Sequence, residues 1–134
     1  MLKYRKYYII YRDNKNTDKN LEVIIVKLLV AGSRTITDFD LSEYIDSDVD
    51  VILSGGAKGI DCIAEKFADK KRLSKIILRP KYELYGKSAP LKRNEELVEM
   101  ADKILVVWDG VSKGTGHTIE YAKKLDKEIK VVTK

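Results

Sequence analysis

The chain has 134 residues, of which 44% are hydrophobic and 35% charged, with a formal net charge of +5, one cysteine and one histidine. These values predict one globular domain, and they exclude an internal disulfide and a histidine-based metal cluster. The longest apolar run, 21–30, contains Glu22 and Lys27 and is too short to cross a membrane. The basic start, 1–6, lacks the long apolar segment of a signal peptide. We therefore expect a cytoplasmic protein with no membrane partner, no metal and no cofactor.

Residues 1–20 differ from the rest of the chain, and we assign them to an N-terminal extension that precedes an α/β domain at 21–134. Residues 6–12 are rich in tyrosine and isoleucine and predict an extra strand, added at the edge of the sheet. The polar residues 13–20 predict a turn or mobile loop. The alternative for the whole segment is a loosely held extension.

Strands and helices alternate from residue 21 onward. The apolar patterns predict strands at 23–31, 49–53, 75–78, 103–108 and 129–133. Helices are predicted after the box Thr37-x-x-Asp40, over 60–68, from Pro90 to 101 and over 118–127, with 81–89 as a long loop. This alternation is typical of a Rossmann-like, doubly wound parallel sheet of about five strands with helices on both faces. A strand order of 3-2-1-4-5 would make the carboxyl ends of the first, second and fourth strands neighbours.

Two glycine-rich turns each leave a predicted strand and enter a predicted helix. The first is Ser54-Gly55-Gly56-Ala57-Lys58-Gly59, and the second runs from Asp109-Gly110 to Gly114-Thr115-Gly116-His117-Thr118. Glycine lets a backbone approach a ligand closely, and a helix N-terminus offers unpaired N–H groups with partial positive charge. Neither turn has the spacing of a dinucleotide fingerprint or a P-loop. Together they predict a pocket for a phosphate-bearing ligand, a nucleotide or a derivative of one.

The candidate ligand-binding residues come from these two turns and from a third turn after the first strand. They are Gly32, Ser33, Arg34, Ser54, Gly55, Gly56, Lys58, Asp109, Gly114, Thr115, Gly116, His117 and Thr118. A purely structural role is the alternative for each: a solvated lysine at position 58, a turn-forming aspartate at 109 and a helix-start contact at 117.

Other polar and aromatic residues near these turns receive mainly structural interpretations. We interpret Asp61 as a helix cap, Cys62 as a small packing residue and Trp108 as part of the core. Tyr82 and Tyr85 either cover a bound base or are exposed loop aromatics.

Four segments, in this order, resemble motifs of the SLOG superfamily. They are Val30-Ala31-Gly32-Ser33-Arg34, the stretch from Ser54 to Asp61, Lys92-Arg93-Asn94-Glu95, and the stretch from Gly114 to Glu120. This superfamily includes the DNA-processing protein A (Smf) family and the Lonely Guy phosphoribohydrolases. The resemblance is closest to the small bacterial and phage branch related to YspA, and it covers about residues 27–133. It implies a homo-oligomer, because relatives in this superfamily commonly pair.

The resemblance also implies two candidate catalytic residues, Arg93 and Glu120. They match the arginine and glutamate with which the Lonely Guy enzymes cleave the N-glycosidic bond of nucleoside 5′-monophosphates. The chain departs from that motif, which begins Pro-Gly-Gly, because Asp109-Gly110 is followed by Val111-Ser112-Lys113 before Gly114. This insertion shifts the alignment of the glutamate by a few residues, so binding can persist where hydrolysis does not.

Three functions follow from these observations. The leading hypothesis is that the domain binds a nucleotide or nucleotide-derived small molecule, for sensing or sequestration. The alternative is a phosphoribohydrolase that acts on a nucleoside 5′-monophosphate. The second alternative is a single-stranded DNA-binding module, but the scattered basic charge and the lack of a row of stacking aromatics argue against nucleic acid.

Overall fold

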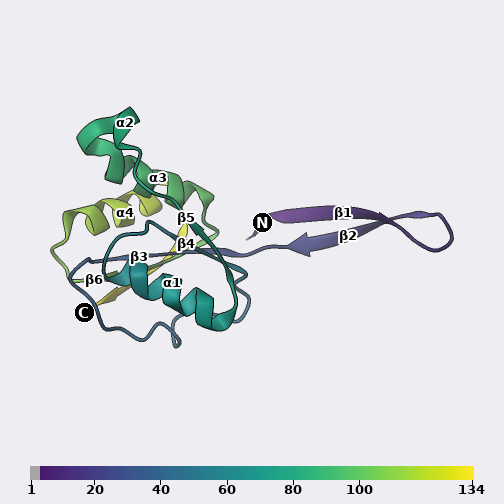
Figure 1. The fold of residues 1–134 in the computed structure, drawn as a ribbon, viewed down its shortest axis with the longest axis horizontal. Coiled ribbons are helices and arrows are strands. Elements are labelled where there is room, and N and C mark those ends of the chain that lie inside the picture. The colour runs from purple at the N-terminus through teal and green to yellow at the C-terminus, as the bar shows by residue number, and fades with distance from the viewer. Residues whose placement is uncertain (1–3) are drawn as a thin grey trace.

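The structure, a computed structural model, describes residues 4–134 as an α/β body from which a β-hairpin projects (Figure 1). The strands are β1 (Lys6–Arg12), β2 (Asp18–Ile24), β3 (Lys27–Gly32), β4 (Val51–Ser54), β5 (Ser74–Ile77), β6 (Lys103–Trp108) and β7 (Glu128–Thr133). The helices are α1 (Ile60–Lys71), α2 (Tyr82–Tyr85), the 3₁₀ turn η1 (Gly86–Ser88), α3 (Ala89–Met100) and α4 (Lys113–Lys124).

The sheet of the body has five parallel strands in the order β5-β4-β3-β6-β7. This is the order 3-2-1-4-5, which makes the carboxyl ends of β3, β4 and β6 neighbours, and the predicted Rossmann-like class is confirmed. From β3 the chain adds β4 and β5 on one side of the sheet and then returns to add β6 and β7 on the other side of β3. The strand order therefore reverses at β3, which pairs with both β4 and β6. Ligands of open parallel sheets bind beyond the carboxyl ends of strands at such a reversal.

Two hydrophobic cores lie on the two faces of the sheet. In β6, Leu105 and Val107 pack in the core that includes α1, whereas Ile104 and Val106 pack in the core that includes α3 and α4. Residues of one strand alternate between the two cores because successive side chains point to opposite faces. Burial on both faces explains why the sequence shows continuous apolar runs rather than alternation.

Helix α1 lies on one face of the sheet and packs against it along one side. Ile60, Ala64 and Ala68 are buried against the sheet, four residues apart. Cys62 is exposed, so its interpretation as a packing residue is wrong. Two residues after Ile60 the helix has turned by about 200°, which places Cys62 on the opposite side.

The helix predicted after Thr37-x-x-Asp40 does not form, and turns occupy this stretch instead. The Asp40 carboxylate accepts hydrogen bonds from the backbone N–H of Ser42 at 2.9 Å and from its hydroxyl at 2.6 Å. Such short-range bonds offer the backbone an alternative to helical pairing. Leu41 is nevertheless buried in the α1 core. In the loop predicted at 81–89, the chain instead forms α2 and η1.

The N-terminal segment forms a hairpin of its own and does not add a strand to the sheet. The predicted strand at 6–12 is confirmed as β1, but it pairs antiparallel with β2, for example Ile9 with Leu21. Residues 18–20, predicted as turn or loop, therefore belong to a strand, and the predicted strand at 23–31 divides between β2 and β3. The Asp13 carboxylate accepts the N–H groups of Lys15 and Thr17, which closes the turn of the hairpin.

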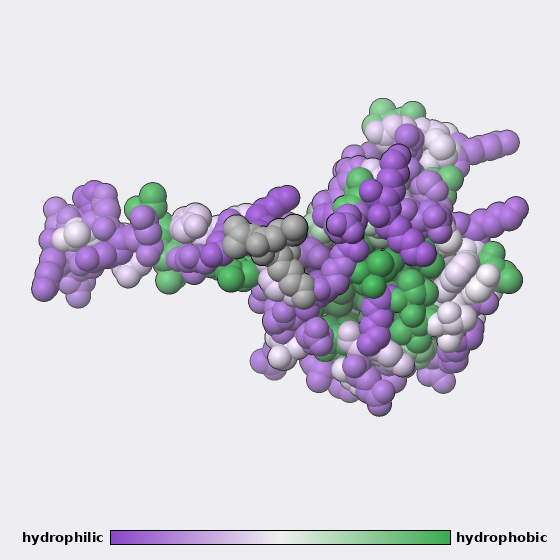
Figure 2. Space-filling model, turned by 180° about the vertical axis from the view of Figure 1, so that it is seen from behind, coloured by the Kyte–Doolittle hydropathy of each residue, from purple (hydrophilic) through white to green (hydrophobic). Residues whose placement is uncertain are grey.

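The hairpin leaves apolar side chains in solvent on both of its faces, and Figure 2 shows hydrophobic and hydrophilic residues mixed along it. Tyr8 is 65% exposed and Ile10 is 70% exposed. None of the helices within residues 4–134 combines the length and the hydrophobicity needed to cross a lipid bilayer.

Candidate functional site

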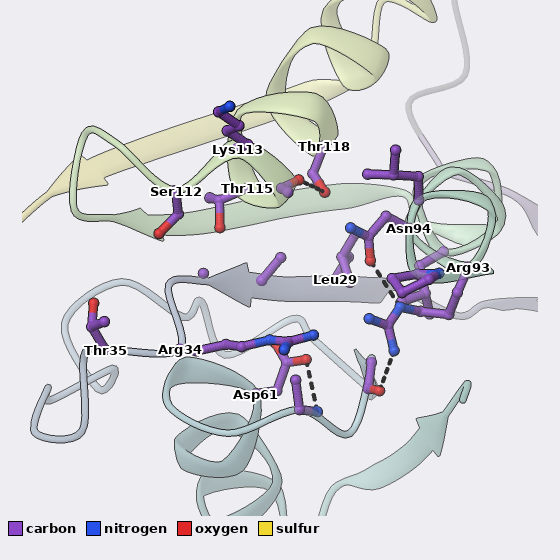
Figure 3. Close-up of a pocket in the computed structure, with 18 residues that line it drawn as sticks. Leu29, Arg34, Thr35, Asp61, Arg93, Asn94, Ser112, Lys113, Thr115 and Thr118 are labelled. Atoms are coloured by element: carbon purple, nitrogen blue, oxygen red, sulfur yellow. Dashed lines mark hydrogen bonds between the residues drawn. The ribbon is translucent and has the colours of Figure 1, made fainter. Parts of the chain in front are cut away.

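A cavity of about 370 Å³ lies at the carboxyl edge of the sheet, where β3 and β4 end (Figure 3). Its volume lies within the range of ligand pockets, about 300–1,000 Å³. The turn after β4 and the start of α1 form one wall, and α3 and the start of α4 form the others. The lining residues are Leu29, Ala31, Gly32, Arg34, Thr35, Gly55, Ala57, Asp61, Pro90, Leu91, Arg93, Asn94, Leu97, Ser112, Lys113, Gly114, Thr115 and Thr118.

The cavity carries a net positive charge. Among the described residues that line it, Arg34, Arg93 and Lys113 are cationic, and Asp61 is the only carboxylate. Arg34 is exposed, and no hydrogen bond to the rest of residues 4–134 holds its guanidinium. Figure 3 shows its side chain extending toward Asp61, and its charge lowers the pKa of that carboxyl slightly against the opposing effect of burial.

Arg93, predicted as a catalytic residue, ties α3 to the glycine-rich turn after β4. It is only 6% exposed, and its Nη1 donates to the carbonyl oxygens of Gly55 and Leu78. Its Nε donates to the Asn94 side chain at 2.8 Å. Burial lowers the pKa of Arg93, and the nearby Asp61 charge opposes that shift. Arg93 therefore lines the cavity while holding its wall in place.

Asp61 reaches the cavity from the first turn of α1. It is 7% exposed, and its Oδ2 accepts the backbone N–H of Ala57 at 3.1 Å. Ala57 lies outside the helix, so the interpretation of Asp61 as a helix cap is wrong. Burial raises the pKa of Asp61, while the Ala57 hydrogen bond and the Arg93 charge act in the opposite direction. Its spacing of three and seven residues from the buried Ala64 and Ala68 is a sequence signal that it faces inward.

The turn between β4 and α1 contributes less to the cavity than we predicted. Gly55 lines it, but Ser54, Gly56 and Lys58 do not. The buried Ser54 hydroxyl accepts the N–H of Gly56 at 3.2 Å, and Lys58 is exposed to solvent. A Cβ on Gly56 would lie 2.7 Å from Nη1 of Arg79, so protein atoms already occupy the space beside this glycine.

Ser33 and Asp109 hold the ends of β3 and β6 together and do not line the cavity. The buried Ser33 hydroxyl accepts the backbone N–H of Asp109 at 3.0 Å. The Asp109 carboxylate accepts the N–H groups of Ser112 and Val111, and these bonds hold its pKa well below the usual value. Asp109 therefore has the turn-forming role that was the alternative to ligand binding.

Helix α4 begins at Lys113, five residues earlier than predicted. Gly114, Thr115, Gly116 and His117 are therefore helical and do not form a loop. The N-cap, Ser112, makes no side-chain capping bond, and Gly116 is the first residue whose N–H donates to a helical carbonyl, that of Ser112. The preceding N–H groups have no acceptor within the helix. A Cβ on Gly114 would meet no atom within 4 Å.

The rotation of α4 divides its candidate residues into two groups. Thr115 and Thr118 are buried and line the cavity, and the Thr118 hydroxyl donates to the carbonyl of Gly114 at 3.2 Å. His117 contacts Glu95 of α3 instead, with 3.0 Å between Nε2 and Oε2. Glu120 is exposed and does not line the cavity.

Neighbouring aromatic residues stay outside the cavity. Trp108 packs in the α3–α4 core and donates its indole N–H to the Ser112 carbonyl at 3.0 Å, in line with the core interpretation. Tyr82 and Tyr85 are exposed on α2 and are not among the lining residues. Gly116 lies beside Trp108, because a Cβ added to this glycine would lie 3.6 Å from Cζ2 of the indole ring.

Seven of the candidate residues therefore meet at one cavity: Gly32, Arg34, Gly55, Arg93, Gly114, Thr115 and Thr118. Polar residues that line it but were not among the candidates are Thr35, Asp61, Asn94, Ser112 and Lys113.

No protein-family model matches the chain, and searches of curated proteins and of solved structures found no match either. The fold and the site define a Rossmann-like α/β protein with a basic cavity at the carboxyl edge of its parallel sheet.

Proposed function

We propose that the cavity binds a nucleotide or nucleotide-derived small molecule and that its basic side holds the phosphate. The observation that carries this proposal is the start of α4. Three residues, Lys113, Gly114 and Thr115, line the cavity at a helix N-terminus whose first N–H groups have no helical acceptor. A phosphate accepts hydrogen bonds from several N–H groups, and its negative charge is stabilised at the positive end of the helix dipole.

Arg34 supplies the side-chain charge that complements these backbone groups. Its guanidinium is exposed at the cavity and makes no hydrogen bond within the described part of the chain. An arginine can donate two parallel hydrogen bonds to a phosphate, which adds geometric selectivity to charge attraction. Arg93 adds positive charge but is already engaged by the Gly55 and Leu78 carbonyl groups.

The remaining wall of the cavity suits the rest of a nucleotide. Leu29, Ala31, Leu91 and Leu97 line it with apolar side chains. Ligand pockets generally combine such apolar walls with a few convergent polar groups.

The positions of the four resembling segments support the SLOG assignment that we propose for the chain. Each segment contributes lining residues: Gly32 and Arg34, Gly55 and Asp61, Arg93 and Asn94, and Gly114 and Thr118. Residues 78 positions apart, such as Arg34 and Ser112, thus meet at one site.

Binding without hydrolysis agrees better with this geometry than the phosphoribohydrolase alternative. The resemblance assigns hydrolysis to a glutamate, which has to reach the sugar of the ligand. Glu120, the residue implied by the resemblance, is exposed on another side of α4.

Isothermal titration across the common nucleoside 5′-monophosphates and 5′-diphosphates tests the proposal, together with mass spectrometry of small molecules released by denaturing the purified protein. We expect saturable binding of at least one nucleotide class or a copurified phosphate-bearing molecule at one per chain. No heat from any member of the panel, with no copurified ligand, would overturn the proposal.

A further inference from the structure

Asp61 supplies the only carboxylate among the described residues that line the cavity. Asp61 is more than nine-tenths buried, and burial of an ionised carboxylate is unfavourable unless it is compensated. The only hydrogen bond to its carboxylate within residues 4–134 comes from the Ala57 N–H, and no arginine approaches that carboxylate closely enough to form an ion pair. The position of Asp61 thus leaves most of its hydrogen-bonding capacity facing the cavity.

The chemistry of a carboxylate restricts what part of a ligand it can contact. An ionised carboxylate only accepts hydrogen bonds, and its two oxygens offer about four acceptor positions. The Ala57 N–H occupies one of them. A phosphate at neutral pH offers negatively charged oxygens, which Asp61 repels. The partner of Asp61 is therefore a hydroxyl or N–H group on another part of the ligand.

The location of Asp61 favours the sugar over the base. A Cβ built on Gly55 would lie 2.9 Å from Oδ2 of Asp61 and 2.8 Å from Cζ of Arg93, so the carboxylate and the guanidinium flank the same glycine. Arg34 extends toward Asp61 from the other side (Figure 3). In a nucleotide the sugar joins the phosphate to the base, so the ligand group next to a phosphate held by Arg34 and the start of α4 is the sugar.

We propose that Asp61 accepts a hydrogen bond from the 2′- or 3′-hydroxyl of a ribose, so that the cavity selects ribonucleotides. This inference rests on the proposed function, because it assumes a nucleotide in the cavity. A hydrogen bond from a ligand hydroxyl to a buried carboxylate is charge-assisted, and the site loses it entirely when the hydroxyl is absent. The cavity would therefore bind a deoxynucleotide more weakly than a ribonucleotide, because the deoxynucleotide leaves the buried carboxylate without a hydrogen-bond donor.

The test compares one nucleotide with its analogues, using the full chain. The tightest-binding ribonucleotide of the titration panel is compared with its 2′-deoxy, 3′-deoxy and 2′,3′-dideoxy forms. We expect the dideoxy form to bind about tenfold more weakly or worse, which is the loss of one charge-assisted hydrogen bond. Asp61→Asn should reduce this preference toward parity, while its side-chain oxygen still accepts the Ala57 N–H.

Inorganic pyrophosphate separates a ligand contact from a structural role. Without a sugar to contact, pyrophosphate should bind Asp61→Asn more tightly than wild type, because the substitution removes a negative charge from the cavity. If Asp61 had a purely structural role, Asp61→Asn would weaken the binding of both the nucleotide and pyrophosphate. Asp69→Asn, on the exposed side of the same helix, is the matched control and should change neither affinity.

The possible outcomes separate the role of Asp61 from the proposed binding of a nucleotide. Equal affinity of wild type for the ribo and dideoxy forms would overturn the role of Asp61 and leave nucleotide binding standing. Loss of pyrophosphate binding in Asp61→Asn would also overturn it. Absence of binding by every nucleotide and by pyrophosphate would overturn both proposals.

Discussion

The two glycine-rich turns look alike in the sequence but differ in what lies beside their glycines. In the turn between β4 and α1, protein atoms occupy the space: a Cβ on Gly59 would lie 2.4 Å from the Ser33 carbonyl oxygen. At the start of α4, a Cβ on Gly114 would meet nothing within 4 Å. The first turn needs glycine for the packing of its own chain. The second leaves a free helix N-terminus and open space at the cavity.

The first N–H group of each helix differs in the same sense. The N–H of Ile60, the first residue of α1, donates to the Ser33 carbonyl. The corresponding N–H groups of α4 have no such partner among the described backbone bonds. Of the two turns, the start of α4 therefore has the unused space and the unused donors that a phosphate needs.

Substitution of Gly59 by alanine should destabilise the protein most. Gly59 has a φ of 75°, which is unfavourable for alanine, and its new Cβ would collide with the backbone of Ser33 and Arg34. We expect a loss of about 3 kcal/mol in the free energy of unfolding, measured by urea denaturation. Gly110→Ala is the matched control, since Gly110 has a φ of 85° but open surroundings, and it should lose only about 1 kcal/mol. Equal losses would contradict the crowding at Gly59.

Substitution of Arg34 by glutamine should weaken ligand binding without affecting stability. We expect about a tenfold loss of affinity for the bound nucleotide, the cost of one charge-assisted contact, and a change below about 0.5 kcal/mol in stability. Titration calorimetry and thermal melting measure the two effects. Arg12→Gln in the hairpin, where Arg12 pairs with Asp18 at 3.0 Å, is the control and should retain full affinity. Unchanged binding in Arg34→Gln would remove this side chain from the site.

Substitution of Gly114 by alanine should change stability and binding in opposite directions. Alanine favours the helix over glycine by up to about 1 kcal/mol, and nothing obstructs the added methyl group in the protein. The methyl group enters space that we assign to the ligand, so affinity should fall. A variant that is stabilised and binds as tightly as wild type would show that the ligand lies elsewhere.

Asp61 should make the stability of the folded protein depend on pH. Burial raises its folded-state pKa above the unfolded value of about 3.9. Between these two values the folded state holds more protons, so its stability falls as pH rises through this window. Asp61→Asn should therefore have a higher Tm than wild type near neutral pH, and this advantage should shrink below about pH 4. A constant difference in Tm across that range would contradict the raised pKa.

The smallest effect is expected at Lys58, the basic residue of the first turn. Lys58 is exposed and does not line the cavity. Lys58→Gln should keep both the nucleotide affinity and the stability of wild type, within about 0.5 kcal/mol. A clear loss of affinity would mean that the ligand extends over the β4–α1 turn.

Local patterns were sufficient to predict the sheet. The strands at 51–54 and 103–108 are buried on both faces, and the helix spacing of Ile60, Ala64 and Ala68 is a strong local signal. Both signals depend on neighbours in the sequence. The strand order then brought Arg34, Gly55 and Gly114 to one edge, as predicted.

The errors occurred where specific side-chain contacts, some local and some long-range, determine the course of the backbone. Helix α4 starts early because Asp109 holds the Ser112 N–H and Trp108 holds the Ser112 carbonyl, despite two glycines in its first turns. That shift in the helix start also decides which side chains reach the cavity. Asp61 was missed because its partner, Ala57, lies in a turn whose path depends on Arg93 of α3. The hairpin was missed because polar residues at 18–20 pair with β1 in solvent.

An amide chemical-shift map of the full chain, recorded while the tightest-binding nucleotide is added, tests whether the phosphate binds at the start of α4. We predict that the largest saturable shifts fall on the N–H groups of Lys113, Gly114 and Thr115, at the free start of α4. Shifts confined to the β4–α1 turn, or scattered over the surface without saturation, would contradict the assignment of the phosphate to α4.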